Sequence, residues 1–323
     1  MQHLDIKIPK DSLKISEIVL GTDYFGSTVP ETVAFRLLDI FADAGGNCVD
    51  TSRVYAAWLP GGMGISEKTV GKWMKTRGNR NRMILSTKGG HPPLDQMDRG
   101  RLSRRELESD LDESLKALGV DAVDLYWLHR DDLSHPVEDI METLSIMVSK
   151  GKIRAAGCSN WSTERLAEAN RAALANGFPA FCASQIQWSL ATSTPDAHGD
   201  LTIVCMNEHE YEWYAKEKFP VFAFSSQAKG FFARAAAKGL EAINQKAYAR
   251  FRSPENIARL ERVREYAGQN GLTPTATALG YILSNRVPAV AIVGCKNEEQ
   301  LADTLTATDI RLPEATVDWL FRG

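Results

Sequence analysis

The run VDLYWLH at residues 123–129 is almost entirely apolar and ends in a histidine. It stands between two segments with helical periodicity, residues 103–118 and 136–149. Strands that are apolar on both faces are typical of parallel sheets covered by helices, and a strand followed by a helix is the repeating unit of such sheets. This part of the chain therefore predicts an α/β protein built around a parallel sheet.

The same unit repeats in both directions from this run. Seven further short apolar runs have the same character, namely EIVLGT (17–22), NCVD (47–50), MILSTK (83–88), IRAAGCS (153–159), CASQIQW (182–188), PVFAFS (220–225) and AVAIV (289–293). The other helical segments are 31–44, 66–76, 162–175, 207–217, 256–284 with a break near Gly271–Pro274, and 297–305. Eight such units in a chain of 323 residues predict one (β/α)8 TIM barrel domain spanning residues 1–323.

An open, doubly wound sheet is the competing arrangement. It predicts a GxGxxG turn after an early strand, and the sequence has GTDYFGS (21–27) at that place instead, so the closed barrel is favoured. Ahead of the first unit, residues 4–8 and 12–15 are expected to form a short hairpin that closes the bottom of the barrel. Segments 189–206 and 229–255 are expected to be long loops that build the pocket.

The composition is that of an ordinary globular protein, with 44% hydrophobic and 24% charged residues and a net charge of −3. No basic stripe indicates a nucleic-acid partner, and no apolar run approaches the ~18 residues of a membrane span. Five scattered cysteines without a CxxC pair favour a reducing compartment, and the N-terminal segment has no apolar signal core. We therefore expect a cytoplasmic protein without a membrane partner. The oligomeric state does not follow from the sequence.

Polar side chains stand at the C-terminal ends of the predicted strands, where barrel enzymes carry their chemistry. Asp50 ends one strand, Lys88 the next and His129 the third, and Tyr55 follows closely after Asp50. Later strand ends carry Ser159, Asn160 and Gln185. The ends of parallel strands share one rim of the barrel, so we expect these groups to converge.

An aspartate, a tyrosine, a lysine and a histidine together are suited to the reduction of a carbonyl. A free tyrosine is a poor acid at neutral pH, and a nearby lysine ammonium is expected to lower its pKa. Asp50 would hold Lys88 in place, and His129 would hydrogen-bond the carbonyl oxygen. Tyr55 would supply the proton, whereas the hydride has to come from a cofactor because no side chain provides one.

The order and spacing of eight segments resemble the aldo-keto reductase family over about residues 14–306. The segments are VDTSRVY (49–55), GISEKTVGKWM (64–74), ILSTKGG (84–90), DLYWLHRDD (124–132), GKIRAAGCSNW (151–161), QIQWSL (185–190), VFAFSSQAKG (221–230) and IVGCKNEEQL (292–301). The stretches SSQAKGFF and VCMNEHEYEWY are similar to bacterial members close to the potassium-channel β-subunit and aldose-reducing branches. The resemblance implies an (α/β)8 barrel that binds NADP(H) in an extended form without a Rossmann unit.

The resemblance also assigns roles to single residues. The catalytic tetrad falls on Asp50, Tyr55, Lys88 and His129, with Tyr55 as the general acid/base. The implied cofactor contacts are Ser159, Asn160 and Gln185 on the nicotinamide carboxamide, Phe224 on the nicotinamide ring, Ser225, Gln227 and Gly230 on the pyrophosphate, and Gly294, Lys296, Gln300 and Asp303 at the adenosine end.

Three positions depart from the family pattern. Members commonly have Tyr where this chain has Phe224 and Pro where it has Ser226. Many members place an Arg that grips the 2′-phosphate where Gln300 stands, which leaves Lys296 as the charged partner for that group. NADP is therefore the expected cofactor, and NAD stays open as an alternative.

Three aromatic residues are expected near the substrate, which would be a small carbonyl compound or a sugar. Tyr24 follows the first barrel strand, Trp58 lies in the loop after Tyr55, and Trp127 shares a strand face with His129. For Trp127, ordinary packing inside the barrel is an equal alternative. The sequence does not identify the substrate or the physiological direction.

Other functions are compatible with parts of the pattern. The resembled family includes channel β-subunits with slow or no turnover, so a cofactor-sensing regulatory subunit is the main alternative to an enzyme. A lyase that uses Lys88 as a Schiff base needs a lysine of low pKa, and an adjacent Asp50 argues against it. Metal-dependent hydrolysis lacks the HxH or HExxH spacing of a metal site, so no metal is expected.

Overall fold

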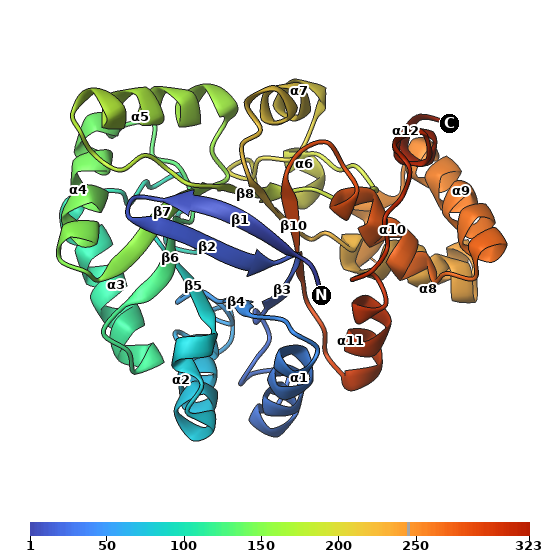
Figure 1. The fold of residues 1–323 in the computed structure, drawn as a ribbon, viewed down its shortest axis with the longest axis horizontal. Coiled ribbons are helices and arrows are strands. Elements are labelled where there is room, and N and C mark those ends of the chain that lie inside the picture. Colours follow the sequence, from blue (N-terminus) through green and yellow to red (C-terminus); the bar gives the residue numbers. More distant parts are fainter. Residues whose placement is uncertain (244–245) are drawn as a thin grey trace.

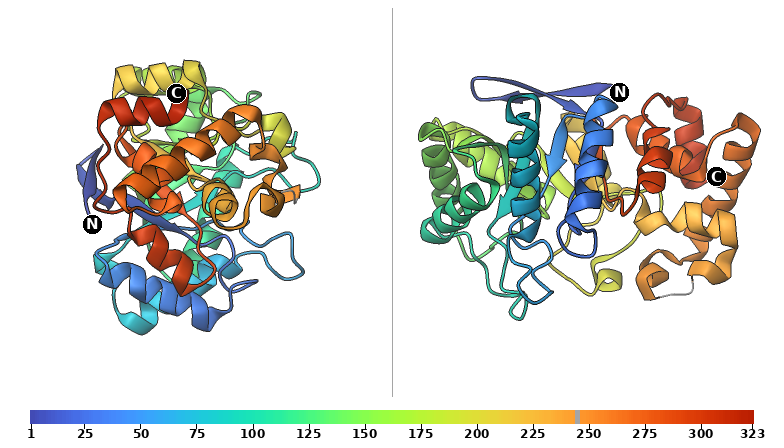
Figure 2. Two further views of the ribbon diagram at one scale, coloured as in Figure 1. Left: turned by 90° about the vertical axis from the view of Figure 1, so that its right-hand side faces the viewer. Right: turned by 90° about the horizontal axis from the view of Figure 1, so that it is seen from below.

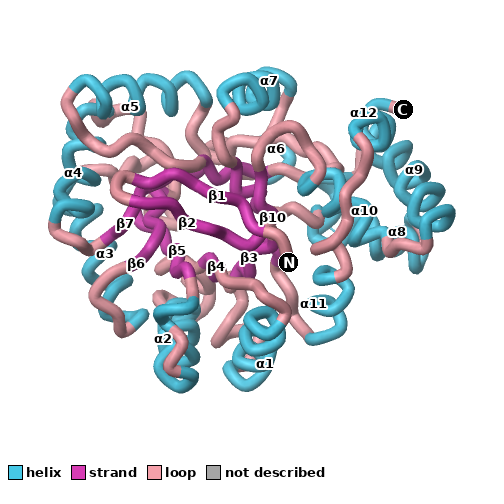
Figure 3. The backbone as a smooth tube through the Cα atoms, viewed as in Figure 1, coloured by secondary structure: helices cyan, strands magenta, loops and turns pink. Residues whose placement is uncertain are grey.

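The computed structural model describes residues 1–243 and 246–323. Eight parallel strands close into a barrel in the order β10-β3-β4-β5-β6-β7-β8-β9, which is the magenta centre of Figure 3. They are β3 (Ile18–Gly21), β4 (Cys48–Asp50), β5 (Ile84–Gly89), β6 (Val123–Leu128), β7 (Ile153–Ser159), β8 (Ser184–Gln187), β9 (Val221–Phe224) and β10 (Ala289–Val293). The predicted (β/α)8 TIM barrel is confirmed.

Helices surround the barrel (Figure 1). Those that match predicted segments are α1 (Glu31–Asp43), α2 (Ile65–Arg77), α3 (Arg104–Leu118), α4 (Val137–Ser149), α5 (Thr163–Ala175), α7 (Glu208–Glu217), α9 (Pro254–Asn270), α10 (Pro274–Leu283) and α11 (Glu298–Leu305). Gly271, with a φ of 64°, ends α9 before α10 begins, so the predicted break is confirmed. Among the described residues, no helix is long and apolar enough to cross a membrane.

The segments predicted as long loops hold more helix than expected. Residues 189–206 contain α6 (Pro195–His198), and residues 229–255 contain α8 (Phe231–Lys238) and 3-10 turns at Leu240–Ile243 and Lys246–Phe251. Helix α8 forms because its two phenylalanines and Ala235 share a buried face. Residues 244–245 of this predicted loop lie outside the described residues. A further helix, α12 (Glu314–Arg322), follows the last predicted element.

The N-terminal hairpin closes one end of the barrel, as predicted. Strands β1 (His3–Ile8) and β2 (Asp11–Ser16) pair antiparallel. Ile6, Leu13 and Ile15 are buried against residues of the barrel interior such as Leu125. In the right-hand view of Figure 2 the blue hairpin lies across one end, and the loops that follow β4, β5 and β8 project from the other. The open end is therefore the C-terminal end of the strands.

Helix α3 shows how local sequence sets the ends of an element. Ser103 caps it by accepting a hydrogen bond from the backbone N–H of Glu106 at 3.4 Å. Leu107 and Leu111 are buried on the face toward the barrel. Gly119 ends the helix in the left-handed conformation, with a φ of 68°.

The register of the strands brings polar residues to one level near the open end. The aligned pairs are Asp50 with Ser86, Lys88 with Trp127, and Ser159 with Gln185. Because alternate residues of a strand point to the same face, Ser86 and Lys88 both point to the face that Asp50 occupies. The interior is thus apolar next to the hairpin and polar at the mouth.

Candidate active site

Three of the predicted groups meet through direct hydrogen bonds at the open end of the barrel. Lys88 Nζ donates to Asp50 Oδ2 at 2.5 Å and to the Tyr55 phenol oxygen at 2.9 Å. The Tyr55 hydroxyl lies 3.3 Å from the same Asp50 oxygen. The side chains of Lys88 and Asp50 are each 1% exposed. A buried ion pair therefore lies directly beneath a partly exposed phenol.

The segment that carries Tyr55 is held by a carboxylate on α3. Asp110 Oδ1 accepts from Arg53 Nη1 at 2.9 Å and from Arg101 Nη2 at 3.0 Å. Asp110 Oδ2 accepts from the backbone N–H of Gly90 at 2.9 Å. Asp110 thus joins the loop of Tyr55 to the end of the strand that carries Lys88. Its only signal in the sequence is a carboxylate on the apolar face of a helix.

Burial dominates the charge states of this group. It lowers the pKa of Lys88, and the Asp50 carboxylate opposes that shift. It raises the pKa of Tyr55 well above the usual value of 10, and the Asp50 and Asp23 carboxylates raise it further. The expected net lowering of the pKa of Tyr55 beside Lys88 is not found, because burial and the Asp50 and Asp23 carboxylates act in the opposite direction. Tyr55 is protonated at neutral pH.

His129 lies beside Tyr55, just after β6. The two ring centroids are 6.3 Å apart, and His129 Nδ1 lies 3.4 Å from Ser52 Oγ. Burial, with the neighbouring His91 and the positive charge of Arg130, lowers the pKa of His129 well below 6.5. His129 is therefore a neutral imidazole. In the tautomer that carries its proton on Nε2, Nδ1 accepts a hydrogen bond from the Ser52 hydroxyl.

Two neighbours of His129 had no role in the sequence-based prediction. The His91 ring stands edge-on to His129 at 4.7 Å, and its Nδ1 donates to the Pro92 carbonyl at 2.6 Å. Burial lowers the pKa of His91 to about 4, so it is neutral as well. Arg130 donates to Asp200 Oδ2 at 3.0 Å and so ties the segment after β8 to the site. Both residues follow a strand end, which is the signal that identified the tetrad.

The three residues predicted for the nicotinamide lie together at the ends of β7 and β8. Gln185 Nε2 donates to Asp50 Oδ1 at 3.3 Å, which points the amide oxygen away from the carboxylate. Asn160, with a φ of 60°, donates to Ser159 Oγ at 3.0 Å and accepts from the Val204 N–H at 3.1 Å. The Ser159 hydroxyl and the Gln185 amide oxygen together offer one donor and one acceptor beside the tetrad.

The segment after Phe224 has an unusual backbone. Positive φ angles occur at Ser225 (51°), Ala228 (48°), Lys229 (55°) and Gly230 (81°). Residues other than glycine rarely adopt this conformation, and such strain collects at ligand sites. Runs of this kind also form concavities of backbone N–H groups that bind anions. Gln227 braces the segment by donating to Thr304 Oγ1 at 2.7 Å.

Lys296 lies just before α11, and Gln300 lies in the first turn of that helix. Asn297 caps the helix by accepting from the Gln300 N–H at 2.9 Å, and Gln300 Oε1 accepts from the Lys296 N–H at 2.9 Å. The amide nitrogen of Gln300 is therefore the part of its side chain that can donate to a ligand. Lys296 Nζ lies 4.4 Å from the centroid of the Tyr24 ring.

Gly294 and Asp303 have different surroundings. Asp303 Oδ2 accepts from the Thr275 hydroxyl at 2.6 Å and so joins α11 to α10. A Cβ on Gly294 would lie 3.6 Å from Asp23 Oδ1. Burial raises the pKa of Asp23 to about 6, although three lysines at the rim oppose the shift. Asp23, two residues beyond the end of β3, is a titratable carboxyl that reasoning from the sequence missed.

The three aromatic residues predicted to contact substrate differ in placement. Tyr24 and Trp58 meet edge to face with centroids 6.4 Å apart, and Trp58 is 53% exposed. Trp127 is fully buried, 4.8 Å from the Phe222 ring, and a Cβ on Gly157 would lie 2.3 Å from it. Trp127 has no exposed surface for a substrate, so its placement favours the alternative of packing inside the barrel.

Comparison with known proteins agrees with this geometry. The model of the aldo/keto reductase family matches residues 17–320. The chain belongs to this family. It is 28% identical to norsolorinic acid reductase stcV of Emericella nidulans over 96% of this chain and 78% of that protein. It is 29% identical to the oxidoreductase YrpG of Bacillus subtilis (94% and 90%) and 25% identical to an NADP(+) aryl-alcohol dehydrogenase of Phanerodontia chrysosporium (97% and 83%).

Membership places this aldo/keto reductase among oxidoreductases that use nicotinamide cofactors and act on small carbonyl compounds. The family match covers all eight barrel strands and the four tetrad positions. The match does not determine whether the cofactor is NADP or NAD, which substrate is used, or the role of each side chain.

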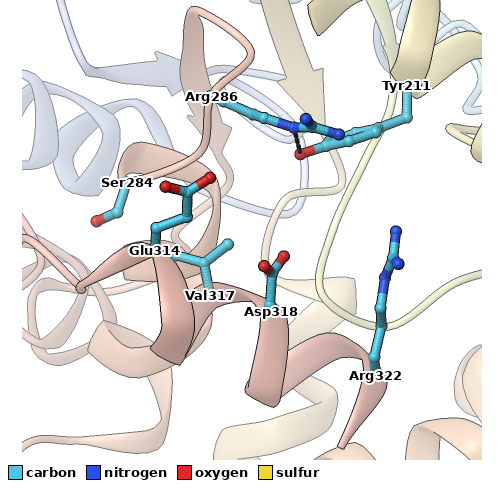
Figure 4. Close-up of a pocket in the computed structure, with 7 residues that line it drawn as sticks. All are labelled: Tyr211, Ser284, Arg286, Glu314, Val317, Asp318 and Arg322. Carbon is cyan, nitrogen blue, oxygen red and sulfur yellow. Dashed lines mark hydrogen bonds between the residues drawn. The ribbon is translucent and has the colours of Figure 1, made fainter.

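The reductase also has hollows on its outer surface. One of about 230 Å³, shown in Figure 4, is lined by Tyr211, Ser284, Arg286, Glu314, Val317, Asp318 and Arg322. The Arg286 guanidinium lies 5.2 Å from the centroid of the Tyr211 ring. An adjoining hollow of about 330 Å³ shares several of these residues. Within the described part of the chain, neither hollow is lined by a predicted site residue, and their acidic and basic side chains balance.

Proposed function

We propose that this chain reduces an aldehyde, ketone or sugar carbonyl to an alcohol with NAD(P)H, or catalyses the reverse reaction, with Tyr55 as the general acid/base. The observation that carries the proposal is the contact of Lys88 Nζ with both Asp50 Oδ2 and the Tyr55 hydroxyl. An ion pair, a protonated phenol and a neutral imidazole at one barrel mouth are suited to proton transfer to a carbonyl oxygen. We further propose that residues 1–323 act as one barrel domain in the cytoplasm.

The residues around the tetrad fit a nicotinamide dinucleotide. Ser159, Asn160 and Gln185 would hold the carboxamide. The segment 225–230, in which four residues have positive φ, would hold the diphosphate through backbone N–H groups. Phe224, at the end of β9, would contact the nicotinamide ring. When bound, the cofactor supplies the hydride that no side chain can provide.

The side chains then have distinct tasks. Tyr55 donates its phenolic proton to the carbonyl oxygen, and neutral His129 donates a hydrogen bond to the same oxygen. Lys88 lies 2.9 Å from the phenol oxygen and stabilises the tyrosinate that remains. Asp50 keeps the Lys88 ammonium in place. In the oxidation direction the tyrosinate removes the proton from the alcohol.

NADP is the proposed cofactor, with NAD as the alternative. Lys296 and the amide nitrogen of Gln300 are the groups offered to a 2′-phosphate at the start of α11, where the helix dipole also favours an anion. Glu298 and Glu299 in the first turn oppose that anion. We therefore propose a modest preference for NADPH, supported by the NADP(+) in the name of a relative.

An aromatic carbonyl is the substrate class to try first. The edge-to-face pair of Tyr24 and exposed Trp58 forms an aromatic wall at the rim, and such walls bind planar rings. Aryl alcohols appear in the names of two relatives. Aldoses and aliphatic aldehydes complete the substrate panel.

The test is to follow NADPH consumption by the wild-type protein with this panel, and NADPH binding in parallel. Turnover of at least one carbonyl that Tyr55→Phe abolishes supports the proposal. Tight NADPH binding without turnover of any carbonyl would support the alternative, a cofactor-sensing regulatory subunit.

A further inference from the structure

Beneath the tetrad, Trp127 is linked to Asp50 through Ser86. Trp127 Nε1 lies 2.7 Å from Ser86 Oγ, and Ser86 Oγ lies 2.7 Å from Asp50 Oδ1. All three residues are fully buried. The link runs from the apolar interior next to the hairpin up to the ion pair at the mouth.

The chemistry of the three groups gives this link one direction. An indole N–H only donates, and an ionised carboxylate only accepts. The Ser86 hydroxyl has a single proton, so while it accepts from Trp127 it donates that proton to Asp50. Without the indole, the Ser86 hydroxyl could rotate and donate to another acceptor. With the indole in place, Ser86 donates to Asp50.

The Trp127–Ser86 pair contacts only Oδ1 of Asp50, and Oδ2 contacts Lys88 and Tyr55. Among the described residues, Oδ1 accepts from Ser86 at 2.7 Å and from Gln185 at 3.3 Å. Oδ2 lies 2.5 Å from Lys88 Nζ and 3.3 Å from the Tyr55 hydroxyl. Holding Oδ1 from below therefore sets the plane of the carboxylate and aims Oδ2 at Lys88 and Tyr55.

The Trp127 ring itself cannot turn away. It meets Phe222 of β9 with centroids 4.8 Å apart at an interplanar angle of 69°. On the β7 side, a Cβ built on Gly157 would lie only 2.3 Å from the ring, a separation that real Cβ atoms do not adopt. Gly157 thus makes room for the indole, and the position of its N–H is set by the barrel wall.

We propose that Trp127 and Ser86 are positioning residues that hold the Asp50 carboxylate in the orientation required by Lys88 and Tyr55. The inference rests on the proposed function, because it assigns the two residues to the same proton transfer. Neither contacts the reacting atoms.

The decisive comparison is between two buried tryptophans. Trp127→Phe removes the indole donor to Ser86. Trp73→Phe is the matched control: Trp73 is equally buried and donates from Nε1 at 2.8 Å, but to Asp39 on the helical layer. We expect Trp127→Phe to lower kcat/KM by up to about tenfold, the upper end of the range for one neutral hydrogen bond, with KM for the nucleotide unchanged. Trp73→Phe should leave kcat/KM unchanged even where its melting temperature falls.

The pH profile separates positioning from packing. A change in the way Asp50 holds Lys88 and Tyr55 should alter the pH dependence of kcat/KM in Trp127→Phe and not in Trp73→Phe. The other charged groups near the pair, namely Asp23, Glu67 and Arg130, are the same in both variants. Ser86→Ala should shift the profile in the same direction, and the double variant should fall no further than Ser86→Ala alone.

A measurement independent of activity completes the test. In the NMR spectrum, Ser86→Ala should shift the indole N–H signal of Trp127 and speed its exchange, and leave the Trp73 signal in place. An unshifted Trp127 signal, equal pH profiles for the two tryptophan variants, or additive losses in the double variant would overturn the inference while Tyr55→Phe stays inactive. A wild-type protein that reduces no carbonyl would instead overturn the proposed function, and this role with it.

Discussion

The two sides of the barrel mouth are built differently. On the tetrad side (Asp50, Tyr55, Lys88 and His129), the groups sit at or just after strand ends, and three of them bond directly to one another. The loop side consists of residues 224–230, which follow the end of β9, and residues 294–303, which lead into α11. Gln227 donates to Thr304 there, and Lys296 Nζ lies over the Tyr24 ring.

This difference teaches which substitutions change chemistry and which change binding. The tetrad side is preorganised by buried strands, so losing one atom there should reduce turnover. Side chains on the loop side contact other residues of the chain and must give up those contacts to bind a nucleotide. Substitutions there should therefore change nucleotide preference, by smaller factors than tetrad substitutions change turnover. The predictions below test that division.

Tyr55→Phe should have the largest effect. It removes the proton donor and keeps the ring, so turnover should fall by at least about 100-fold, the usual size of general acid catalysis. The affinity for NADPH, measured by fluorescence titration, should be nearly unchanged. If the variant retains most of its activity, Tyr55 is not the proton donor, and the tetrad side is not where substitutions reduce turnover most.

Lys88→Met should follow, with turnover about 10–100-fold lower at neutral pH because the tyrosinate loses a charged hydrogen-bond partner. Asp50→Asn should slow turnover less. Its cost should appear as a loss of roughly 3–5 kcal/mol in the free energy of unfolding, since a buried ammonium is left unpaired. Steady-state kinetics and urea denaturation measure the two effects. Slower turnover by Asp50→Asn than by Lys88→Met would reverse the two roles.

Lys296→Ala tests the loop side. We expect wild-type protein to prefer NADPH over NADH by about tenfold, for one charge-assisted contact offset by nearby carboxylates. The variant should lose most of that preference and keep its NADH kinetics, as measured by KM for each nucleotide. Equal weakening of both nucleotides would show that Lys296 does not read the 2′-phosphate.

Asp23→Asn should have the smallest effect. Asp23 lies between the two sides, near Lys88 on one side and Lys229 and Lys296 on the other. The pKa of Asp23 is about 6 in the folded protein against an ordinary 3.8, so the folded state favours the protonated carboxyl. Its stabilising contribution is complete below about pH 4 and is lost as the pH rises through about 6. The variant should therefore exceed wild type by about 1 kcal/mol at pH 8, allowing for partial exposure, and match it at pH 4. Urea denaturation at both pH values checks this. A stability difference that does not grow with pH would contradict it.

The barrel and the meeting of polar groups at one rim could be predicted from the sequence because both depend on local patterns. Apolar runs alternate with helical periodicity, and a polar residue at the end of an apolar run stands out, as Asp50, Lys88 and His129 do. Residues 189–206 and 229–255 were harder, since α8 is stabilised by tertiary burial of Phe231 and Phe232 rather than by a long periodic pattern.

Only the folded chain decides which polar groups meet. Arg130 donates to Asp200, and Asp110 accepts from Arg53, Arg101 and the backbone N–H of Gly90, across sequence separations of 9 to 70 residues that carry no pattern of their own. The pKa of Tyr55 is also decided by the folded chain, because it depends on burial and on the nearby Asp50 and Asp23 carboxylates.

Trp127 shows the boundary most clearly. Strand periodicity correctly places it on the face that carries His129, but that face also continues down into the closed interior. Whether a side chain there reaches a substrate or a neighbouring serine depends on its depth in the barrel and on what the opposite strands leave open. The alternation of side chains along one strand predicts neither the depth of Trp127 in the barrel nor the space around it. Packing against Phe222 and Gly157 therefore decides the position of the indole.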